Sequence, residues 1–485
     1  MQRRRFLAAA GSLALPATAR ADEQTYRRFH AALAREPALA VYADTVGSQA
    51  GDAVVSGRLP ADLQGSFYRN GPGRFELGGE RYHHWFDGDG FAQRWTIAAG
   101  RVGHQGRFVE TRRFHDESAA GRFLYPSFGT WVARQGFRDN DTLNAANTNL
   151  LPFNGRVYAL WEGGSATEVD PQTLATVGIQ TWRDDLRAMP FSAHPKLDPQ
   201  GGMWNFGALP GSGRIALFQI GADGRVLRTG LVEVPQLAMV HDFAVSARHL
   251  VFMIPPYDLQ PGSDKSFAER HAWAERPLRI VVVAKDTLTV RQVFELPPRM
   301  VFHFGNAWED GDCTRFDVVL HEGDVLSELG GLMAGERPAR LQSRSEAVQV
   351  CLDYAAGQAR CSRLFGAAEF PRVAPQVVGR RHRKLVLLGA GETLLSSVNL
   401  VDTDSGKVDG YRFGAGWQVE EHVLVPRRNA RSETDGYLVG VAQDLRKGVG
   451  VLTVFDAAHV ADGPLALARL PYRTPHCFHG NFLVA

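Results

Sequence analysis

The stretch RIVVVAKDTLTV (279–290) contains the unit on which the fold rests: a short apolar run, an aspartate and a turn. Runs of the same kind recur along the chain as RVYALWE (156–162), RIALFQI (214–220), HLVFMIPP (249–256), FDVVLHE (316–322), KLVLLGA (384–390) and GVLTVFD (450–456). Short runs rich in Val, Ile, Leu and aromatic residues, bounded by Gly, Pro, Asp and Asn, are typical of β-strands. The sequence therefore predicts a chain built from β-hairpins.

The spacing of these units bears on the architecture. Six apolar runs end in an aspartate before a turn, at Asp170, Asp198, Asp286, Asp353, Asp402 and Asp456. The gaps between them range from 28 to 88 residues, and several approach the ~40–50 residues of a β-propeller blade. Aspartate also begins turns in many other folds. On this pattern alone, a propeller and a large β-sandwich are alternatives.

Composition narrows the class of protein. The chain has 485 residues, of which 44% are hydrophobic and 22% charged, as in ordinary soluble enzymes. The net charge of +2 argues against nucleic-acid binding. Four cysteines are too few for a disulfide scaffold. They form no CxxC pair, which argues against a structural zinc site. Three segments are expected to be helical insertions on a single β domain spanning 22–485, namely Thr25–Leu39, Ser266–Glu275 and Leu326–Leu341.

The first 21 residues, MQRRRFLAAAGSLALPATARA, have the pattern of a targeting segment. Arg3 and Arg4 begin an R-R-x-F-L motif, a short apolar run follows, and Ala19-Arg20-Ala21 offers a cleavage site. This order is typical of a twin-arginine (Tat) signal peptide. It predicts export of the folded protein by the Tat machinery to the periplasm. The apolar run is too short to span a bilayer.

Four of the 16 histidines lie inside or beside apolar, strand-like stretches, at His194, His241, His303 and His479. A buried histidine needs partners for both ring nitrogens. A metal on one nitrogen and a carboxylate on the other would satisfy both. Their separations of 47, 62 and 176 residues match no short metal-binding motif. Unrelated core histidines are thus an alternative to a metal site.

Motifs over most of the chain after residue 58 resemble those of the carotenoid cleavage oxygenases, the family of apocarotenoid oxygenases and lignostilbene dioxygenases. In family order they are LPADLQGSFYRNGPG (59–73), HHWFDGDGF (83–91), NTNLLPFNGRVYALWE (147–162), SAHPKLDP (192–199), HDFAVS (241–246), HFGNAWE (303–309), EFPR (369–372), EEHVLVPR (420–427), SETDGY (432–437) and FHGNF (478–482).

This resemblance implies a seven-bladed β-propeller with a dome of loops and helices over an axial metal. It implies Fe(II) bound by His194, His241, His303 and His479, with O2 as co-substrate. Glutamates at family positions that hold three of the imidazoles are Glu162, Glu369 and Glu421. At Glu421 the chain departs from the family, because His422 replaces the usual proline. Thr148 matches a family threonine near the open coordination site.

The implied reaction is oxidative cleavage of a C=C bond in a carotenoid or apocarotenoid to two carbonyl products. Candidate residues for a cavity that takes this lipophilic substrate are Trp161, Phe302, Phe478, Trp131, Phe91 and Phe206. Lignostilbene-type enzymes, the first alternative, tend to carry a lysine where this chain has Trp161. The second alternative is a periplasmic propeller that binds a ligand without catalysis. A complete set of metal-binding residues argues against it.

Two further questions are left open by the sequence. Cys351 and Cys361 flank an expected hairpin turn and could pair in an oxidising compartment. A surface patch could also contact a membrane to collect lipophilic substrate.

Overall fold

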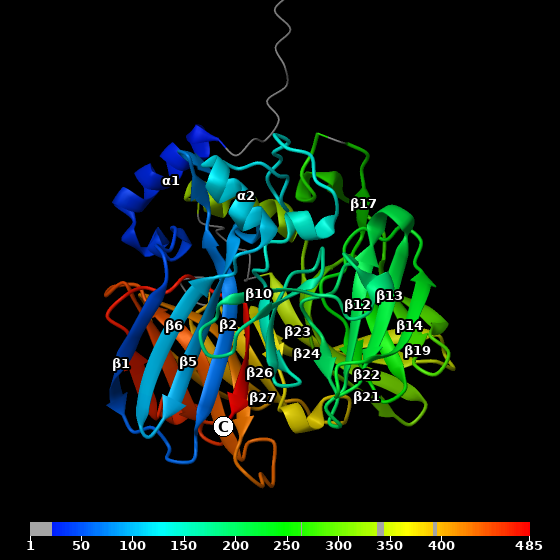
Figure 1. Ribbon diagram of the computed structural model, residues 1–485. Helices are drawn as coiled ribbons and strands as arrows, with labels where there is room; N and C mark the ends of the chain where they lie inside the picture. The colour runs from blue at the N-terminus through cyan, green and yellow to red at the C-terminus, as the bar shows by residue number, and fades with distance from the viewer. Residues whose placement is uncertain (1–21, 263, 337–343, 391–394) are drawn as a thin grey trace, which may run out of the picture.

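Consecutive β-runs joined by short turns pair with one another, so most of the chain forms antiparallel sheets in sequence order (Figure 1). The computed structural model describes residues 22–262, 264–336, 344–390 and 395–485. Five sheets have four strands each and form the blades of a propeller. Two small two-stranded sheets pair β3 (Glu76–Leu77) with β4 (Glu80–Arg81) and β17 (Tyr257–Leu259) with β18 (His271–Trp273).

The five blades follow one another along the chain. The first comprises β7 (Asn149–Phe153), β8 (Arg156–Leu160), β9 (Ala166–Val169) and β10 (Thr176–Gln180). The second comprises β11 (Lys196–Leu197), β12 (Met203–Leu209), β13 (Arg214–Ile220) and β14 (Val226–Glu233). The third comprises β15 (Ala244–Val245), β16 (His249–Ile254), β19 (Leu278–Ala284) and β20 (Thr289–Leu296). The fourth comprises β21 (Met300–Asp310), β22 (Cys313–His321), β23 (Ser345–Asp353) and β24 (Gln358–Gly366). The fifth comprises β25 (Ala368–Arg372), β26 (Lys384–Gly389), β27 (Ser397–Asp402) and β28 (Val408–Arg412).

The remaining nine strands form one continuous sheet that contains both early and late parts of the chain. In spatial order they are β29 (Trp417–Pro426), β30 (Gly436–Asp444), β31 (Val449–Asp456), β32 (Ala466–Arg469), β1 (Gln49–Gly57), β6 (Arg101–Phe108), β5 (Asp89–Ala98), β2 (Gly65–Arg74) and β33 (His479–Val484). The propeller is confirmed, but it has five separate four-stranded blades instead of the seven blades expected. The reason is β1, which pairs with β32 through Val54–Gly57 and with β6 through Gln49–Ala53.

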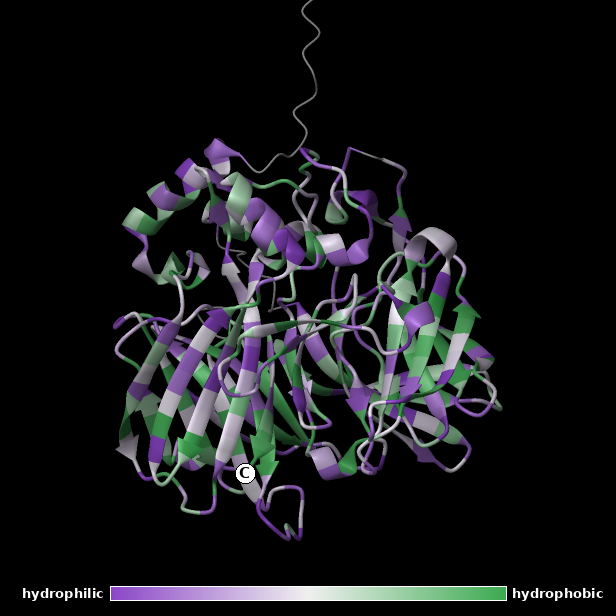
Figure 2. Cartoon of the chain, viewed as in Figure 1, coloured by the Kyte–Doolittle hydropathy of each residue, from purple (hydrophilic) through white to green (hydrophobic). Residues whose placement is uncertain are grey.

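The first strands of the blades lie around the axis of the propeller. β21 contacts β15 and β25, and β33 contacts β7 and β29. Apolar side chains fill the space between neighbouring blades; one cluster includes Phe252 of the third blade and Phe206 of the second. Figure 2 shows hydrophobic residues recurring along the strands, whereas α1 (Glu23–Arg35) and α2 (Arg112–Ala120) carry many hydrophilic residues. Side chains on these innermost strands are therefore held in fixed positions near the axis.

Helices and loops cover one side of the sheets (Figure 1). They include α1, α2, the β17–β18 hairpin and α3 (Val325–Leu329). The 3-10 helices are η1 (Pro37–Tyr42), η2 (Trp85–Asp87), η3 (Asn140–Leu143), η4 (Asp184–Leu186), η5 (Pro210–Ser212), η6 (Ala268–Arg270), η7 (Gly330–Ala334), η8 (Pro375–Val377) and η9 (Val460–Asp462). No helix among the described residues is long and apolar enough to cross a membrane.

The helices differ in part from those expected. The helix expected at 25–39 is present as α1, and Pro37 begins a separate 3-10 helix after it. The expectation of a helix at 266–275 is wrong, because this segment has one 3-10 turn and then enters the β17–β18 hairpin. The segment from 326 is helical only to Ala334, and residues 337–343 lie outside the described residues. The sequence did not reveal α2, whose nine residues begin after the N-cap Thr111.

The register of β23 and β24 answers the question of a disulfide between Cys351 and Cys361. Cys351 pairs with Arg360, whereas Cys361 pairs with Val350. Residues that pair across two strands point to the same face, and successive residues point to opposite faces. The two thiols therefore lie on opposite faces of the sheet, and both are free.

Candidate metal centre

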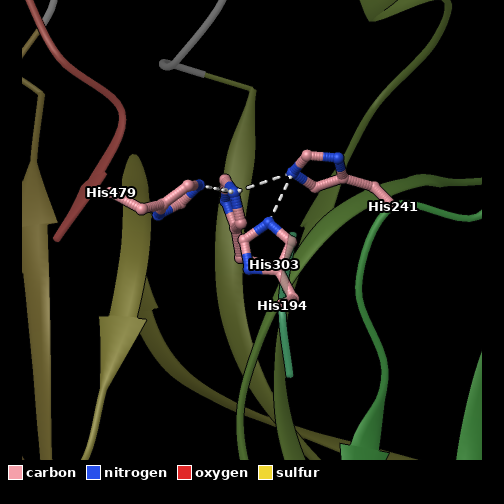
Figure 3. A group of neighbouring side chains, drawn as sticks. All are labelled: His194, His241, His303 and His479. Atoms are coloured by element: carbon pink, nitrogen blue, oxygen red, sulfur yellow. Dashed lines mark hydrogen bonds between the residues drawn. The ribbon is translucent and has the colours of Figure 1, made fainter. Parts of the chain in front are cut away.

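Four histidine side chains from separate parts of the chain meet near the axis (Figure 3). His194 lies two residues before β11 and His241 three residues before β15, while His303 is on β21 and His479 begins β33. All four side chains are buried. The propeller brings them together because each lies on or just before a strand that is the first or last of its sheet.

The Nε2 atoms of the four rings face one another. The Nε2–Nε2 distance is 3.0 Å between His194 and His241. It is 3.2 Å from His241 to His303, and again 3.2 Å from His303 to His479. All four ligand atoms lie within 4.8 Å of one another. The arrangement is that of a cluster converging on one point.

Three glutamates contact the opposite nitrogens of these rings. Nδ1 of His303 lies 2.6 Å from Oε2 of Glu369, on β25. Nδ1 of His479 lies 3.1 Å from Oε1 of Glu421, on β29. Glu162, just after β8, contacts Nδ1 of His241. The structure thus brings all three sequence-predicted glutamates to the imidazoles.

The carboxylates near His303 and His479 are ionised. Burial alone would raise the pKa of Glu421, but Arg372 and His479 lower it to about 2. The pKa of Glu369 also lies well below its ordinary value, because hydrogen bonds from His303 and His321 outweigh its burial. An ionised carboxylate only accepts hydrogen bonds, so the neighbouring Nδ1 atoms carry the protons.

The imidazoles respond differently to this environment. Burial lowers the pKa of His479 to about 4. Burial and the neighbouring imidazoles likewise lower the pKa of His194. Burial also acts on His241, but Glu162 outweighs it and raises the pKa of that ring.

These protonation states leave bare nitrogens in contact. When Nδ1 of a neutral imidazole carries the proton, Nε2 has only a lone pair. The Nδ1 contacts to Glu369 and Glu421 place this arrangement at His303 and His479, whose Nε2 atoms lie 3.2 Å apart, so that their lone pairs repel. A cation at the centre of the cluster would turn this repulsion into attraction. Imidazole nitrogen suits iron, zinc, copper and nickel, so the residues present fit a transition-metal ion.

A cavity of about 680 Å³ lies next to the cluster. His241, His303 and His479 line it, and so does Thr148. Thr148 is close to the cluster in the backbone too, because the N–H of His479 donates to its carbonyl oxygen at 3.3 Å. Five of the six aromatic residues predicted for the substrate cavity also line it: Trp161, Phe302, Phe478, Trp131 and Phe206.

Phe91 is the exception among these residues. Its side chain is fully buried on β5, where it packs edge-on against Phe108 of β6 with ring centroids 5.1 Å apart. Phe91 is not among the residues that line this cavity. Sequence reasoning placed it wrongly because an aromatic residue in a strand does not reveal which side of the sheet it faces.

Sequence reasoning also missed two residues at the cluster. The ring of Phe370 stacks on His303 with centroids 5.0 Å apart. His321, the last residue of β22, has its Nε2 atom 2.6 Å from Oε1 of Glu369. Phe370 follows Glu369 directly in the quoted EFPR motif, and His321 is the penultimate residue of the quoted run FDVVLHE. For Phe370 the only sign in the sequence was its place in this motif, and for His321 its place in the apolar run.

Comparisons with known proteins agree with this site. Residues 44–484 match the family model described as retinal pigment epithelial membrane protein. The chain is 30% identical over 458 residues to the apocarotenoid-15,15'-oxygenase of Synechocystis sp., covering 88% of this chain and 92% of that protein. It is 27% identical over 460 residues to an isoeugenol monooxygenase of Pseudomonas nitroreducens, covering 88% and 94%.

Solved structures show the same fold. Cobalt-substituted apocarotenoid oxygenase of Synechocystis has a TM-score of 0.82 and 26% identity, covering 96% of this chain and 100% of that chain. The motifs, the fold and the length of these matches lead to one conclusion. The chain belongs to the retinal pigment epithelial membrane protein family, the family of carotenoid cleavage oxygenases.

Proposed function

We propose that this protein is a non-haem Fe(II)-dependent dioxygenase that cleaves a C=C bond of a carotenoid or apocarotenoid with O2, giving two carbonyl products. The observation that carries the proposal is the buried cluster of four imidazoles, three of which line a cavity that also contains several aromatic side chains. A substrate in this cavity would lie beside the cluster and away from bulk water.

The residues that would hold the iron are His194, His241, His303 and His479. Bound Fe(II) would supply the redox chemistry that allows O2 to react with an electron-rich double bond. Four imidazoles provide four of the six ligands of an octahedral ion and no compensating charge. The similarity to a cobalt-substituted relative supports a divalent ion at this place.

The glutamates act on the imidazoles rather than on the substrate. Each accepts from an Nδ1–H, which fixes the tautomer and keeps the lone pair of Nε2 directed at the centre of the cluster. Such partners also raise the basicity of a ligand. Their three negative charges offset the charge of a divalent ion one layer away from it.

The cavity residues bind and orient the substrate. The rings of Phe302 and Phe478 and the indole of Trp161 offer apolar surface, as a polyene requires. Trp161 stands where a phenol-cleaving relative tends to have a cation, and its indole N–H is its only donor. A polar group left unpaired in such a site costs ~1–3 kcal/mol. The residue at position 161 therefore favours a polyene over a phenolic stilbene.

A substrate panel tests this proposal. Iron-loaded protein is incubated with carotenoids, apocarotenals, 4-hydroxystilbene and isoeugenol, and O2 uptake and product masses are measured. We expect apocarotenals to give pairs of carbonyl products with loss of visible absorbance. Preferential cleavage of the stilbene or isoeugenol would establish the phenolic alternative. Absence of O2 uptake with every compound, despite bound iron, would support the non-catalytic one.

We also propose export of the folded protein to the periplasm through the twin-arginine route. The support is the order of features in residues 1–21, which lie outside the described residues. Replacing Arg3 and Arg4 together by lysine should retain the protein in the cytoplasm. Unchanged periplasmic recovery of this variant, measured by fractionation, would contradict the proposal.

A further inference from the structure

His321 forms a second imidazole contact to a carboxylate of the metal centre. Its Nε2 atom lies 2.6 Å from Oε1 of Glu369, while Nδ1 of His303 lies 2.6 Å from Oε2 of the same group. The backbone N–H of Phe370 also donates to Oε2, at 2.7 Å. Glu369 therefore lies between two imidazoles, one in the four-histidine cluster and one outside it.

The chemistry of these contacts fixes the direction of each hydrogen bond. A carboxylate without a proton accepts only, so both imidazoles must donate to Glu369. A neutral His321 that carries its proton on Nε2 has a bare Nδ1. That Nδ1 atom is buried and has no hydrogen-bond partner among the described residues. The arrangement thus commits the ring of His321 to Glu369 alone.

The three glutamates are held in different ways. Glu421 has a side-chain partner besides His479, because Nη1 of Arg372 lies 3.5 Å from Oε1 of Glu421. The backbone N–H of Gly480 donates to Oε2 of Glu421 at 2.9 Å. The side chain of Glu162 is 32% exposed. Glu369 is buried, and His321 holds the oxygen that neither His303 nor the backbone contacts.

We propose that His321 is a positioning residue of the metal centre, which acts through Glu369 on His303. By holding Oε1, it stops the carboxylate from turning away from Nδ1 of His303. It also shares the negative charge of Glu369, so that less of this charge is passed to His303. This inference rests on the proposed metal site and names a residue outside the four-histidine cluster that also lines the cavity.

Two nearly isosteric variants separate this role from simple packing. His321→Gln keeps an N–H donor that can reach Glu369, whereas His321→Met fills a similar volume without one. Metal-free proteins are titrated with Co(II), and the dissociation constant and the visible ligand-field spectrum are measured. We expect His321→Met to bind Co(II) ~10–100-fold more weakly, the usual effect of losing an outer partner, with a shifted spectrum. His321→Gln should restore most of the affinity.

His382→Leu is the matched control. His382 is another buried histidine, 2.8 Å from the carboxylate of Asp317, and it lies outside the four-histidine cluster. Its loss should lower the melting temperature and leave the Co(II) affinity and spectrum unchanged. A second measurement needs no variant: ¹⁵N-histidine NMR of the wild type should show the Nε2–H tautomer for His321.

Different outcomes would refute the metal site and the role of His321. Failure of the wild type to bind Co(II) would refute the proposed metal site itself. Wild-type binding together with equal affinity and spectrum in His321→Met would overturn only the role of His321. An Nδ1–H tautomer in the NMR spectrum would overturn it as well, even if His321→Met does not fold.

Discussion

At the scale of single residues, the metal centre contains imidazoles and carboxylates, which are costly to bury unless they have partners. Four imidazoles and two of the three carboxylates are buried. The carboxylates of Glu369 and Glu421 accept from N–H donors, whereas the Nε2 atoms of the four rings face one another. A cation bound at the centre would accept the lone pairs of these Nε2 atoms.

The ligand assignment predicts the effect of His479→Ala. Three imidazoles would remain, and Glu421 would lose the ring that it holds while keeping Arg372. We expect activity to be abolished and the iron content per chain to fall sharply, as measured by mass spectrometry. His104→Ala, at a buried histidine bonded to Gln93 and Tyr472, should retain its iron. Full iron occupancy in His479→Ala would refute the assignment.

The glutamates should act through the ligands. Glu162→Gln and Glu369→Gln remove a charge but preserve size, so the fold should persist. We expect metal affinity or activity to fall ~10–100-fold, with circular dichroism unchanged. If both variants keep wild-type iron content and turnover, their contacts with His241 and His303 have no functional role.

Trp161 should influence which substrate is cleaved. Each Å² of apolar surface buried against the indole stabilises a bound polyene by ~25 cal/mol, and a lysine there would lose part of that contact. We expect Trp161→Lys to lower kcat/KM for an apocarotenal and to raise it for 4-hydroxystilbene. The measurement is kcat/KM for each of the two substrates with the wild type and with Trp161→Lys. A higher kcat/KM of the wild type for the stilbene would contradict the proposal that the substrate is a polyene.

These residues also show where sequence reasoning succeeds and where it ends. Apolar context singles out His194, His241, His303 and His479, but separations of 47, 62 and 176 residues carry no signal that they share one site. Only the family motifs linked them. His321 stayed hidden because no motif includes it and its partner is 48 residues away. His321 lies in the fourth blade and Glu369 in the fifth, and apolar runs do not specify which residues of two neighbouring blades meet.

At the scale of elements, the same limit explains the blade count. The apolar runs identify strands well, but the edges to which strands bind are a property of the assembled sheet. β1 bonds on both edges, to β32 and to β6. An isolated run from 49 to 57 contains nothing that distinguishes such a strand from an edge strand.

A partly buried carboxylate also links the third and fourth blades, and its ionisation should make the stability of the protein depend on pH. Glu309 of β21 accepts from His249 of β16 at 3.0 Å and from Ser246. Burial alone would raise its pKa, but these bonds lower it from 4.5 to about 2. The stabilisation is therefore present above about pH 4.5 and lost as the pH falls towards about 2.

We expect Glu309→Gln to lower the free energy of unfolding by roughly 1–3 kcal/mol near neutral pH, because charged hydrogen bonds are lost. The difference from wild type should shrink as the pH falls from 4.5 to about 2. Denaturant unfolding at several pH values measures this difference in the free energy of unfolding. The control is Glu295→Gln, because Glu295 is exposed. A difference that is constant over this range would show that ionisation of Glu309 does not contribute.

At the scale of the whole molecule, the metal centre joins parts of the chain that are far apart. His194, His241 and His303 come from three successive blades, and His479 from the nine-stranded sheet. An ion bound by all four would link these sheets around the axis. A ligand that binds only the folded state stabilises it by RT ln(1 + [L]/Kd), about 2.7 kcal/mol at a hundredfold excess over Kd.

Removal of the metal should therefore destabilise the entire propeller. We expect the melting temperature to drop after chelation and to recover on addition of Fe(II) under anaerobic conditions. Calorimetry of the loaded and stripped protein is the measurement. His303→Ala, which lacks a ligand, should show no such recovery, and identical melting of loaded and stripped wild type would argue that the cluster holds no metal.

The pairing of β33 with β2 has a consequence for biosynthesis. Ribosomes make the chain from its N-terminus, so β2 emerges more than 400 residues before its partner β33. Until β33 arrives, one edge of β2 lacks its strand, and unpaired edges promote aggregation. The nascent chain at that stage also has three of the four clustered imidazoles. Closure of the ring and completion of the metal centre are thus one late event, and a cell must protect the open intermediate while it waits.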